Sequence, residues 1–332
     1  MTASSTRPGP APCAPRTTEA HAPAGPPAPS TPTAPDTPPY HRLTALAPLL
    51  SVHCAPPRRG DGWLPLAELA ADPAAVRDLV AHDARQGLAR YGQPLRPDVA
   101  AGFGLHRLVW PVSLLFTVPW FLERRVPLLG PGDVSVRRGP ASMELTVRPA
   151  AFVCLPDDPA AGQAAVPGAD PAAVPGADPT TTPPVAARTA PDGAALAAEL
   201  RCALGEFLTP LLAAFGPAVR RGPRVLWAMA TDAVVEGLCY AGELFGEQER
   251  ARAELSALLA PTTPTPGPAR TPGADPTPAP APAPFTPGAG FAPPAPGRSG
   301  ASSTDRTRAS CCLVYTVEPA DMCGGCPRVT RR

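Results

Sequence analysis

The chain contains no lysine. All 29 of its basic residues are arginines, and against 28 acidic residues they give a formal net charge of +1 over 332 residues. Nucleic-acid-binding domains depend on a basic surface that neutralises phosphates, so this near-neutral balance argues against a nucleic-acid partner. Together with abundant alanine, proline and glycine, the exclusive use of arginine indicates the codon bias of a G+C-rich genome.

Other absences narrow the chemistry further. The sequence has no Gly-x-Gly-x-x-Gly or P-loop pattern, and so no recognisable nucleotide site of its own. No histidine follows His106, which excludes a histidine-ligated Rieske cluster in the C-terminal part. No apolar run follows Arg7, so we expect no secretory signal and a cytoplasmic protein. Four cysteines stand alone among apolar neighbours, which agrees with a reducing compartment; these are Cys54, Cys154, Cys202 and Cys239. Free cysteines in such surroundings usually act as small buried hydrophobic residues.

Long hydrophobic runs are also scarce. The longest, Leu108–Leu122, falls short of the ~20 residues of a spanning helix, and Pro111 and Pro119 interrupt it. We therefore expect no transmembrane segment and interpret this run as a buried, kinked pair of core helices.

Proline, by contrast, is in excess, with 53 residues. Most lie in three tracts poor in large apolar side chains, which cannot bury enough surface to offset chain entropy. The tracts predict a disordered tail at 1–39, a disordered loop at 156–191 that contains a tandem octapeptide (164–171 and 172–179), and a semi-rigid linker at 261–299. The remaining chain forms a core domain at 40–260 and a C-terminal cysteine segment at 300–332.

Local patterns predict an α+β core, rich in helices, with a small antiparallel β unit. Asp72 and Pro73 predict a helix start, and Gly92 its end. Alternating residues at 133–138 and 142–148 predict a hairpin, with 151–155 extending its second strand. Apolar spacing predicts three further helices, which are 194–215 (ending at Gly216-Pro217), one opening at Pro223 and ending at Gly246, and 247–259.

The C-terminal segment carries four closely spaced cysteines, Cys311, Cys312, Cys323 and Cys326. Four thiolates that converge favour a soft metal centre. A thioredoxin-like dithiol would need a helix after Cys323-Gly-Gly-Cys326, and Pro327 opposes one. Disulfides would need an oxidising compartment.

Structural zinc is the serious alternative, but its cysteine pairs are usually separated by two to four residues. Adjacent side chains on a strand point in opposite directions, so Cys311 and Cys312 suit two different metal atoms better than one. The spacing therefore favours a [2Fe–2S] cluster over zinc. Tyr315 and the Gly324-Gly325 backbone are candidates for shaping its surroundings. Five arginines surround the motif and are expected to form a solvated tail; these are Arg306, Arg308, Arg328, Arg331 and Arg332.

The segment resembles the C-terminal signature of the FhuF-type ferric-siderophore reductases, a Cys-Cys-x10-Cys-x2-Cys motif. Matching positions are the four cysteines with Leu313, Tyr315, Gly324 and Pro327. Upstream, the helix that contains Arg224-Val-Leu-Trp227 resembles a helix of that family.

The resemblance implies a [2Fe–2S] cluster held by the four cysteines and one-electron reduction of a ferric siderophore, which releases Fe(II) in the cytoplasm. An electron-donor protein or other reductant is then required as a partner. Two alternatives stay open on the residues alone. One is an iron–sulfur electron carrier or sensor without a siderophore substrate, and the other is a zinc-stabilised, non-enzymatic binding module.

Overall fold

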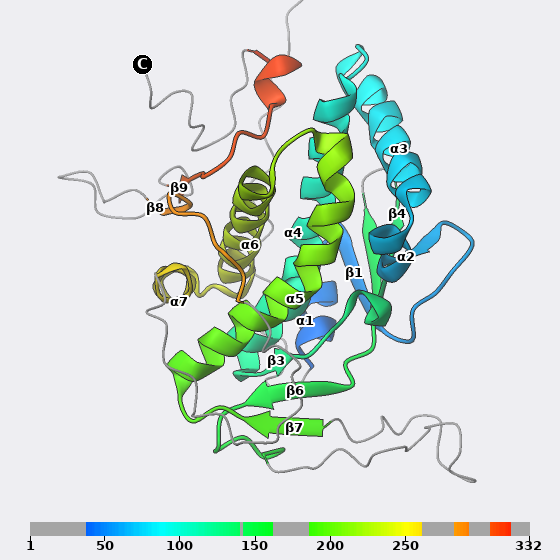
Figure 1. Cartoon of the computed structure of the whole chain (residues 1–332). Coiled ribbons are helices and arrows are strands. Elements are labelled where there is room, and N and C mark those ends of the chain that lie inside the picture. The colour runs from blue at the N-terminus through cyan, green and yellow to red at the C-terminus, as the bar shows by residue number, and fades with distance from the viewer. Residues whose placement is uncertain (1–37, 140–141, 162–185, 261–281, 292–305, 320–332) are drawn as a thin grey trace, which may run out of the picture. The chain divides into compact units, whose positions relative to one another are not determined.

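The computed structural model describes residues 38–139, 142–161, 186–260, 282–291 and 306–319 (Figure 1). The tail at 1–37, the tandem octapeptide, most of the proline-rich linker and the C-terminal end from residue 320 lie outside the described residues. The helices are α1 Pro39–Leu46, α2 Leu66–Ala71, α3 Pro73–Tyr91, α4 Pro97–Glu123, α5 Gly193–Val219, α6 Pro223–Phe245 and α7 Gln248–Leu259. The strands are β1 Leu50–Cys54, β2 Trp63–Pro65, β3 Val126–Pro127, β4 Val134–Arg138, β5 Met143–Val147, β6 Ala151–Cys154, β7 Ala186–Thr189, β8 Gly290–Phe291 and β9 Arg306–Thr307. This arrangement confirms the α+β class.

The core is built around α4, which packs against α3, α5 and α6 (Figure 1). The predicted pair of kinked helices is wrong, because Pro111 and Pro119 lie inside one helix of 27 residues. A proline has no N–H for the carbonyl four residues earlier, and for Pro119 that carbonyl belongs to Leu115. The buried hydroxyl of Tyr40 donates to this carbonyl at 2.7 Å. A side chain 75 positions away thus replaces the missing helical bond.

α5 also continues through a predicted end. The expected stop at Gly216-Pro217 is wrong, since the helix runs to Val219 and ends at Arg220 in the left-handed conformation. Both Phe215 and Val219 are buried, so the extra turn places apolar surface in the core, which favours its formation. The predicted limits of α3, α6 and α7 are confirmed within one residue.

The described residues form three small sheets, of which the two larger ones belong to the core domain and the third pairs β8 with β9. The predicted hairpin forms as β4 and β5, which lie between β1 and β2 in the order β1-β5-β4-β2, with β1 parallel to β5. The expectation that 151–155 extends the hairpin is wrong, because β6 belongs to a second sheet of order β3-β6-β7. β7 pairs in parallel with β6 and lies inside the stretch predicted to be a disordered loop, so that prediction set the loop limits too wide.

Part of the proline-rich linker is docked on the helices. The N–H of Ala283 donates to the carbonyl of Arg201 at 2.8 Å, and the Arg201 guanidinium lies 5.2 Å from the centroid of the Phe285 ring. The N–H of Thr286 donates to the Thr231 hydroxyl of α6 at 3.1 Å. Residues 282–291 are therefore not a spacer, contrary to the sequence prediction for 261–299.

α4 and α5 are long and apolar enough to cross a membrane by length and composition alone. In the most apolar window of α4, 78% of the residues are buried inside the fold, and in that of α5, 50%. The core helix of a water-soluble protein passes the same test, and the packing of both helices is consistent with such a protein.

Candidate functional site

The segment that carries the first two cysteines lies against the helical core. β9, directly before it, pairs with β8 of the docked linker (Figure 1). Residues 308–317 then contact α6 and the junction of α3 with α4. The sequence left open whether the cysteine segment docks on the core, and for residues 306–319 the structure shows that it does.

Asp232 of α6 is the anchor of this segment. Its side chain is buried, with 3% of the residue exposed, in the middle of the helix. One carboxylate oxygen accepts from the N–H of Ala309 and the other from the N–H of Ser310, both at 2.8 Å. The Ser310 hydroxyl donates to the same carboxylate. Charge-assisted hydrogen bonds to a buried carboxylate are among the stronger ones in proteins, so they fix the backbone immediately before Cys311.

Arg308 is a second anchor, and its expected place in a solvated tail is wrong. Its side chain is only 8% exposed and forms ion pairs with Asp232, at 3.9 Å, and with Glu236, at 3.5 Å. The Glu236 carboxylate also lies 3.7 Å from the ring of His106 on α4. A chain of polar side chains thus runs from Arg308 of the cysteine segment through Glu236 of α6 to His106 of α4.

A third attachment follows the cysteines. Leu313 adopts the left-handed conformation with φ of 63° and starts the 3₁₀ turn η3, Val314–Thr316. Val317 is then buried among apolar side chains of the α3–α4 junction, and its carbonyl accepts from the Gln93 amide at 3.0 Å. Cys311 and Cys312 are therefore held between two fixed points, Ser310 and Val317.

Both described cysteines of the motif are half-buried. Cys323 and Cys326 lie outside the described residues, and within the described part of the chain no group of three or more His, Cys, Asp or Glu side chains could hold a metal ion. The donor chemistry of the segment still fits a thiolate-bound cluster, because two adjacent, half-buried thiols lie in a segment that hydrogen bonds hold against the core on both sides. Tyr315 lies on η3 and is also half-buried.

The remaining described cysteines are less suited to hold metal. Burial raises the pKa of the thiols of Cys154 and Cys202, which favours the neutral form over the thiolate. Cys154 is buried as expected, while Cys202 and Cys239 are half-buried. Cys54, at the end of β1, is exposed, so its predicted burial is wrong.

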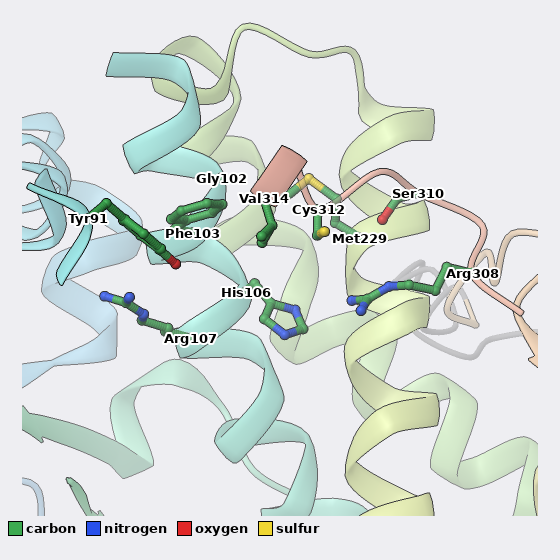
Figure 2. A pocket seen from close by; sticks show the side chains of 10 residues that line it. All are labelled: Tyr91, Gly102, Phe103, His106, Arg107, Met229, Arg308, Ser310, Cys312 and Val314. Atoms are coloured by element: carbon green, nitrogen blue, oxygen red, sulfur yellow. The ribbon is translucent and has the colours of Figure 1, made fainter. Parts of the chain in front are cut away.

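A cavity of about 190 Å³ lies beside Cys312. Figure 2 shows Phe103 and Tyr91 on one side of it, Cys312 and Met229 on another, and the His106 ring between Arg107 and Arg308. Gly102 of α4 leaves space on the wall facing Met229. The cavity brings together α3, α4, α6 and the cysteine segment, and nothing in the local sequence pattern places these residues side by side.

The sequence patterns also missed the residues that position the segment. Asp232 and Glu236 are one turn apart on a helix that is otherwise largely apolar. Acidic residues on such a helix need partners when they are buried, which was the available signal. Such acidic residues predict that hydrogen-bond partners exist. They do not predict which residues these are, because Ser310 is 78 positions away in the chain.

Comparison with known proteins adds one match. The model of the FhuF 2Fe-2S C-terminal domain matches residues 308–328. This range includes all four motif cysteines and begins at the buried Arg308, and it indicates a [2Fe–2S] cluster and supports a relationship to the FhuF family. Neither a curated protein nor a solved structure matches the chain.

Proposed function

We propose that this protein is a cytoplasmic ferric-siderophore reductase whose [2Fe–2S] cluster is held by Cys311, Cys312, Cys323 and Cys326. The observation that carries the proposal is the match of residues 308–328 to a 2Fe-2S domain model. The sequence has no recognisable nucleotide-binding pattern that would indicate another redox cofactor. When bound, the cluster accepts and delivers single electrons.

The chain's own residues have positioning and electrostatic roles. Asp232 fixes the backbone before Cys311 through the N–H groups of Ala309 and Ser310. Arg308, paired with Asp232 and Glu236, attaches the chain to α6 three residues before Cys311. Hydrogen bonds, nearby charge and solvent exposure set the potential of such a centre. Outer-sphere electron transfer needs proximity, so no general acid, base or nucleophile is required of the chain.

The substrate is Fe(III) in an oxygen-donor chelate. Hard carboxylate, catecholate or hydroxamate oxygens hold Fe(III) much more tightly than Fe(II). One electron per iron converts Fe(III) to Fe(II) and weakens the chelate, which then releases the metal. The electron comes from a separate donor protein or reductant, because the sequence has no recognisable nucleotide site of its own.

Metal analysis tests the cofactor and its ligands. The purified chain is expected to be brown, with two irons and two acid-labile sulfides, and Cys311→Ser and Cys323→Ser should each abolish the visible absorbance. Cys54→Ser is the matched control, since Cys54 is exposed on β1 and outside the motif, and it should retain the colour. Colourless protein with one zinc per chain would refute the proposal.

Reduction of substrate is a separate test. Dithionite-reduced protein, freed of excess reductant, is mixed anaerobically with ferric siderophores, and Fe(II) is trapped with ferrozine. Oxidation of the cluster with stoichiometric Fe(II) formation is expected. If the cluster is present but no siderophore yields Fe(II), the chain is an electron carrier or sensor and not a reductase.

A further inference from the structure

The cavity beside Cys312 has walls suited to a flat ring. Phe103 and Tyr91 lie with ring centroids 6.4 Å apart and planes inclined by 55°, and both line the cavity with Met229 and Val314. Aromatic rings and methionine sulfur interact favourably with another aromatic ring. A flexible aliphatic arm would bury surface here but would gain no ring-to-ring contact.

The size of the cavity matches one ring and not a whole chelate. Its volume is about 190 Å³, and a protein cavity of about 150 Å³ accommodates benzene. A six-membered ring with two oxygen substituents therefore fits, while a complete hexadentate siderophore must remain largely outside.

The charge on one side of the cavity favours an anion. Asp83, only 1% exposed, accepts from Arg107 at 2.9 Å and also from the buried guanidinium of Arg138. One carboxylate thus faces two cations, which leaves a positive surplus. Arg138 has a side chain 8% exposed, whereas that of Arg107 is 36% exposed and lines the cavity. Arg107 is therefore the cation that can turn toward a negatively charged ligand.

The opposite side contributes no surplus of positive charge. Arg308 and His106 also line the cavity, but Arg308 lies 3.9 Å from the Asp232 carboxylate and 3.5 Å from that of Glu236, and His106 lies 3.7 Å from Glu236. The positive charge available to a ligand is therefore on the side of Arg107, which shares Asp83 with Arg138. The combination of aromatic wall and arginine is the one that suits an anionic aromatic group.

We propose that this cavity binds one catecholate arm of a ferric chelate, with the ring against Phe103 and Met229 and its oxygens on the side of Arg107. This inference rests on the proposed function, and it names the substrate class. It places the arm beside Cys312, so that the iron it carries approaches the cluster segment without entering the protein core. We expect catecholate chelates to be preferred over hydroxamate chelates, which have no aromatic ring.

Binding is tested apart from reduction by using Ga(III), which has the charge of Fe(III) but is not reduced by the protein. The Ga(III) complex of 2,3-dihydroxybenzoate is titrated into cluster-loaded, full-length protein by calorimetry. The expected result is saturable binding at least about 10-fold tighter than that of a Ga(III) trihydroxamate.

Two variants in the cavity and one control test whether the catecholate complex binds at this site. Arg107→Gln should weaken catecholate binding about 10-fold or more, and Asp83 keeps Arg138 as its partner. Gly102→Ala should also weaken it, because the new methyl enters the cavity at an ordinary 3.6 Å from the Met229 methyl. Arg188→Gln is the matched control. Arg188 lies on β7 of the second sheet, does not line the cavity and pairs with Glu199 of α5, so this variant should bind like the wild type.

Several results would overturn the inference. These are no catecholate binding, equal binding of both chelate classes, or unchanged affinity in both cavity variants. Loss of cluster absorbance in Gly102→Ala would also overturn it, since the cavity would then be space that the cluster needs. If Ga(III)–catecholate binding follows the expected pattern but no Fe(II) forms from the ferric complex, the reductase proposal fails and the binding site stands.

Discussion

Asp232 holds Ser310 by two hydrogen bonds, one from the backbone N–H at 2.8 Å and one from the hydroxyl. Ser310 is the last residue before the adjacent cysteines, so a carboxylate buried in α6 determines where the first thiols lie. Because Ala309 and Arg308 also contact Asp232, three consecutive residues depend on this one side chain.

Asp232→Asn should loosen the cysteine segment. The amide keeps one acceptor oxygen, loses the other and removes the charge that faces Arg308, at an expected cost of about 2–4 kcal/mol to docking of the segment. We expect faster amide exchange at residues 309–317, faster loss of the cluster to a chelator and a shifted reduction potential. A merely structural role in α6 would lower the melting temperature and leave the potential of the remaining holoprotein unchanged.

Ser310→Ala should loosen the cysteine segment less than Asp232→Asn does. It removes the hydroxyl donor and keeps the backbone N–H, so it should cost only about 1 kcal/mol and release the cluster at a rate between those of the wild type and Asp232→Asn. Equal release rates for all three proteins would contradict the anchoring role of Asp232.

Asp83→Asn should destabilise the core strongly. Asp83 of α3 joins Arg107 of α4 to Arg138 of β4, and burial lowers the pKa of Arg138 while the nearby Asp83 opposes that effect. Without the carboxylate, a cation with an 8% exposed side chain loses its charge partner, which costs about 3–5 kcal/mol. The free energy of unfolding from urea denaturation measures this loss.

Glu144→Gln is the matched control for Asp83→Asn. Glu144 accepts from Arg137 on the neighbouring strand, but both side chains are partly exposed, at 30% and 40%. Surface pairs of this kind contribute about 0–1 kcal/mol. If the two variants lose similar amounts of unfolding free energy, burial does not make the ion pairs of Asp83 more stabilising than a surface pair.

Local signals predicted local structure well. The Asp72 carboxylate accepts from the N–H of Ala74, Pro73 occupies the first turn, and Gly92 ends the helix in the left-handed conformation, all as the sequence indicates. These features depend on residues within a few positions of one another. The hairpin of β4 and β5 was predictable for the same reason, since its alternation and turn are adjacent in the sequence.

The failures involve partners distant in the chain. Within α4, the carbonyl that Pro119 leaves without a helical donor accepts from the distant Tyr40, and the sheet that β6 joins is formed with β3 and β7. In the candidate site, the cysteine spacing indicated the chemistry, but the anchoring by Asp232 and the cavity at Phe103 arise from tertiary packing. No periodicity or spacing encodes which distant residue will satisfy a buried polar group.

Asp158→Asn should change how stability depends on pH. Two hydrogen bonds from Arg125, at 2.7 and 2.9 Å, lower the pKa of Asp158 despite the opposing effect of burial. A carboxyl with a lowered folded-state pKa stabilises the fold above its unfolded pKa, near 4, and that contribution is lost as pH falls through the folded value.

The Asp158→Asn variant should therefore melt below the wild type at pH 7, by an amount reflecting at most about 1 kcal/mol because the pair is partly exposed. The difference should shrink as the pH falls below 4. Thermal melts from pH 3 to pH 7 measure it, and a difference that stays constant over this range would show that the ion pair is not its source.

Removal of the tandem octapeptide, residues 164–179, should leave the fold intact. The connection from Cys154 of β6 to Ala186 of β7 has to return along a parallel strand pair of four residues, a distance of about 13 Å. Without the repeat, 15 connecting residues remain, and at about 3.3 Å each they reach far beyond that distance. Shortening a loop by half changes closure entropy by only about 0.6 kcal/mol. We expect a melting temperature within about 2 °C of the wild type and an unchanged iron content. A large fall in either would mean that the repeat contributes contacts to the core or to the cluster segment.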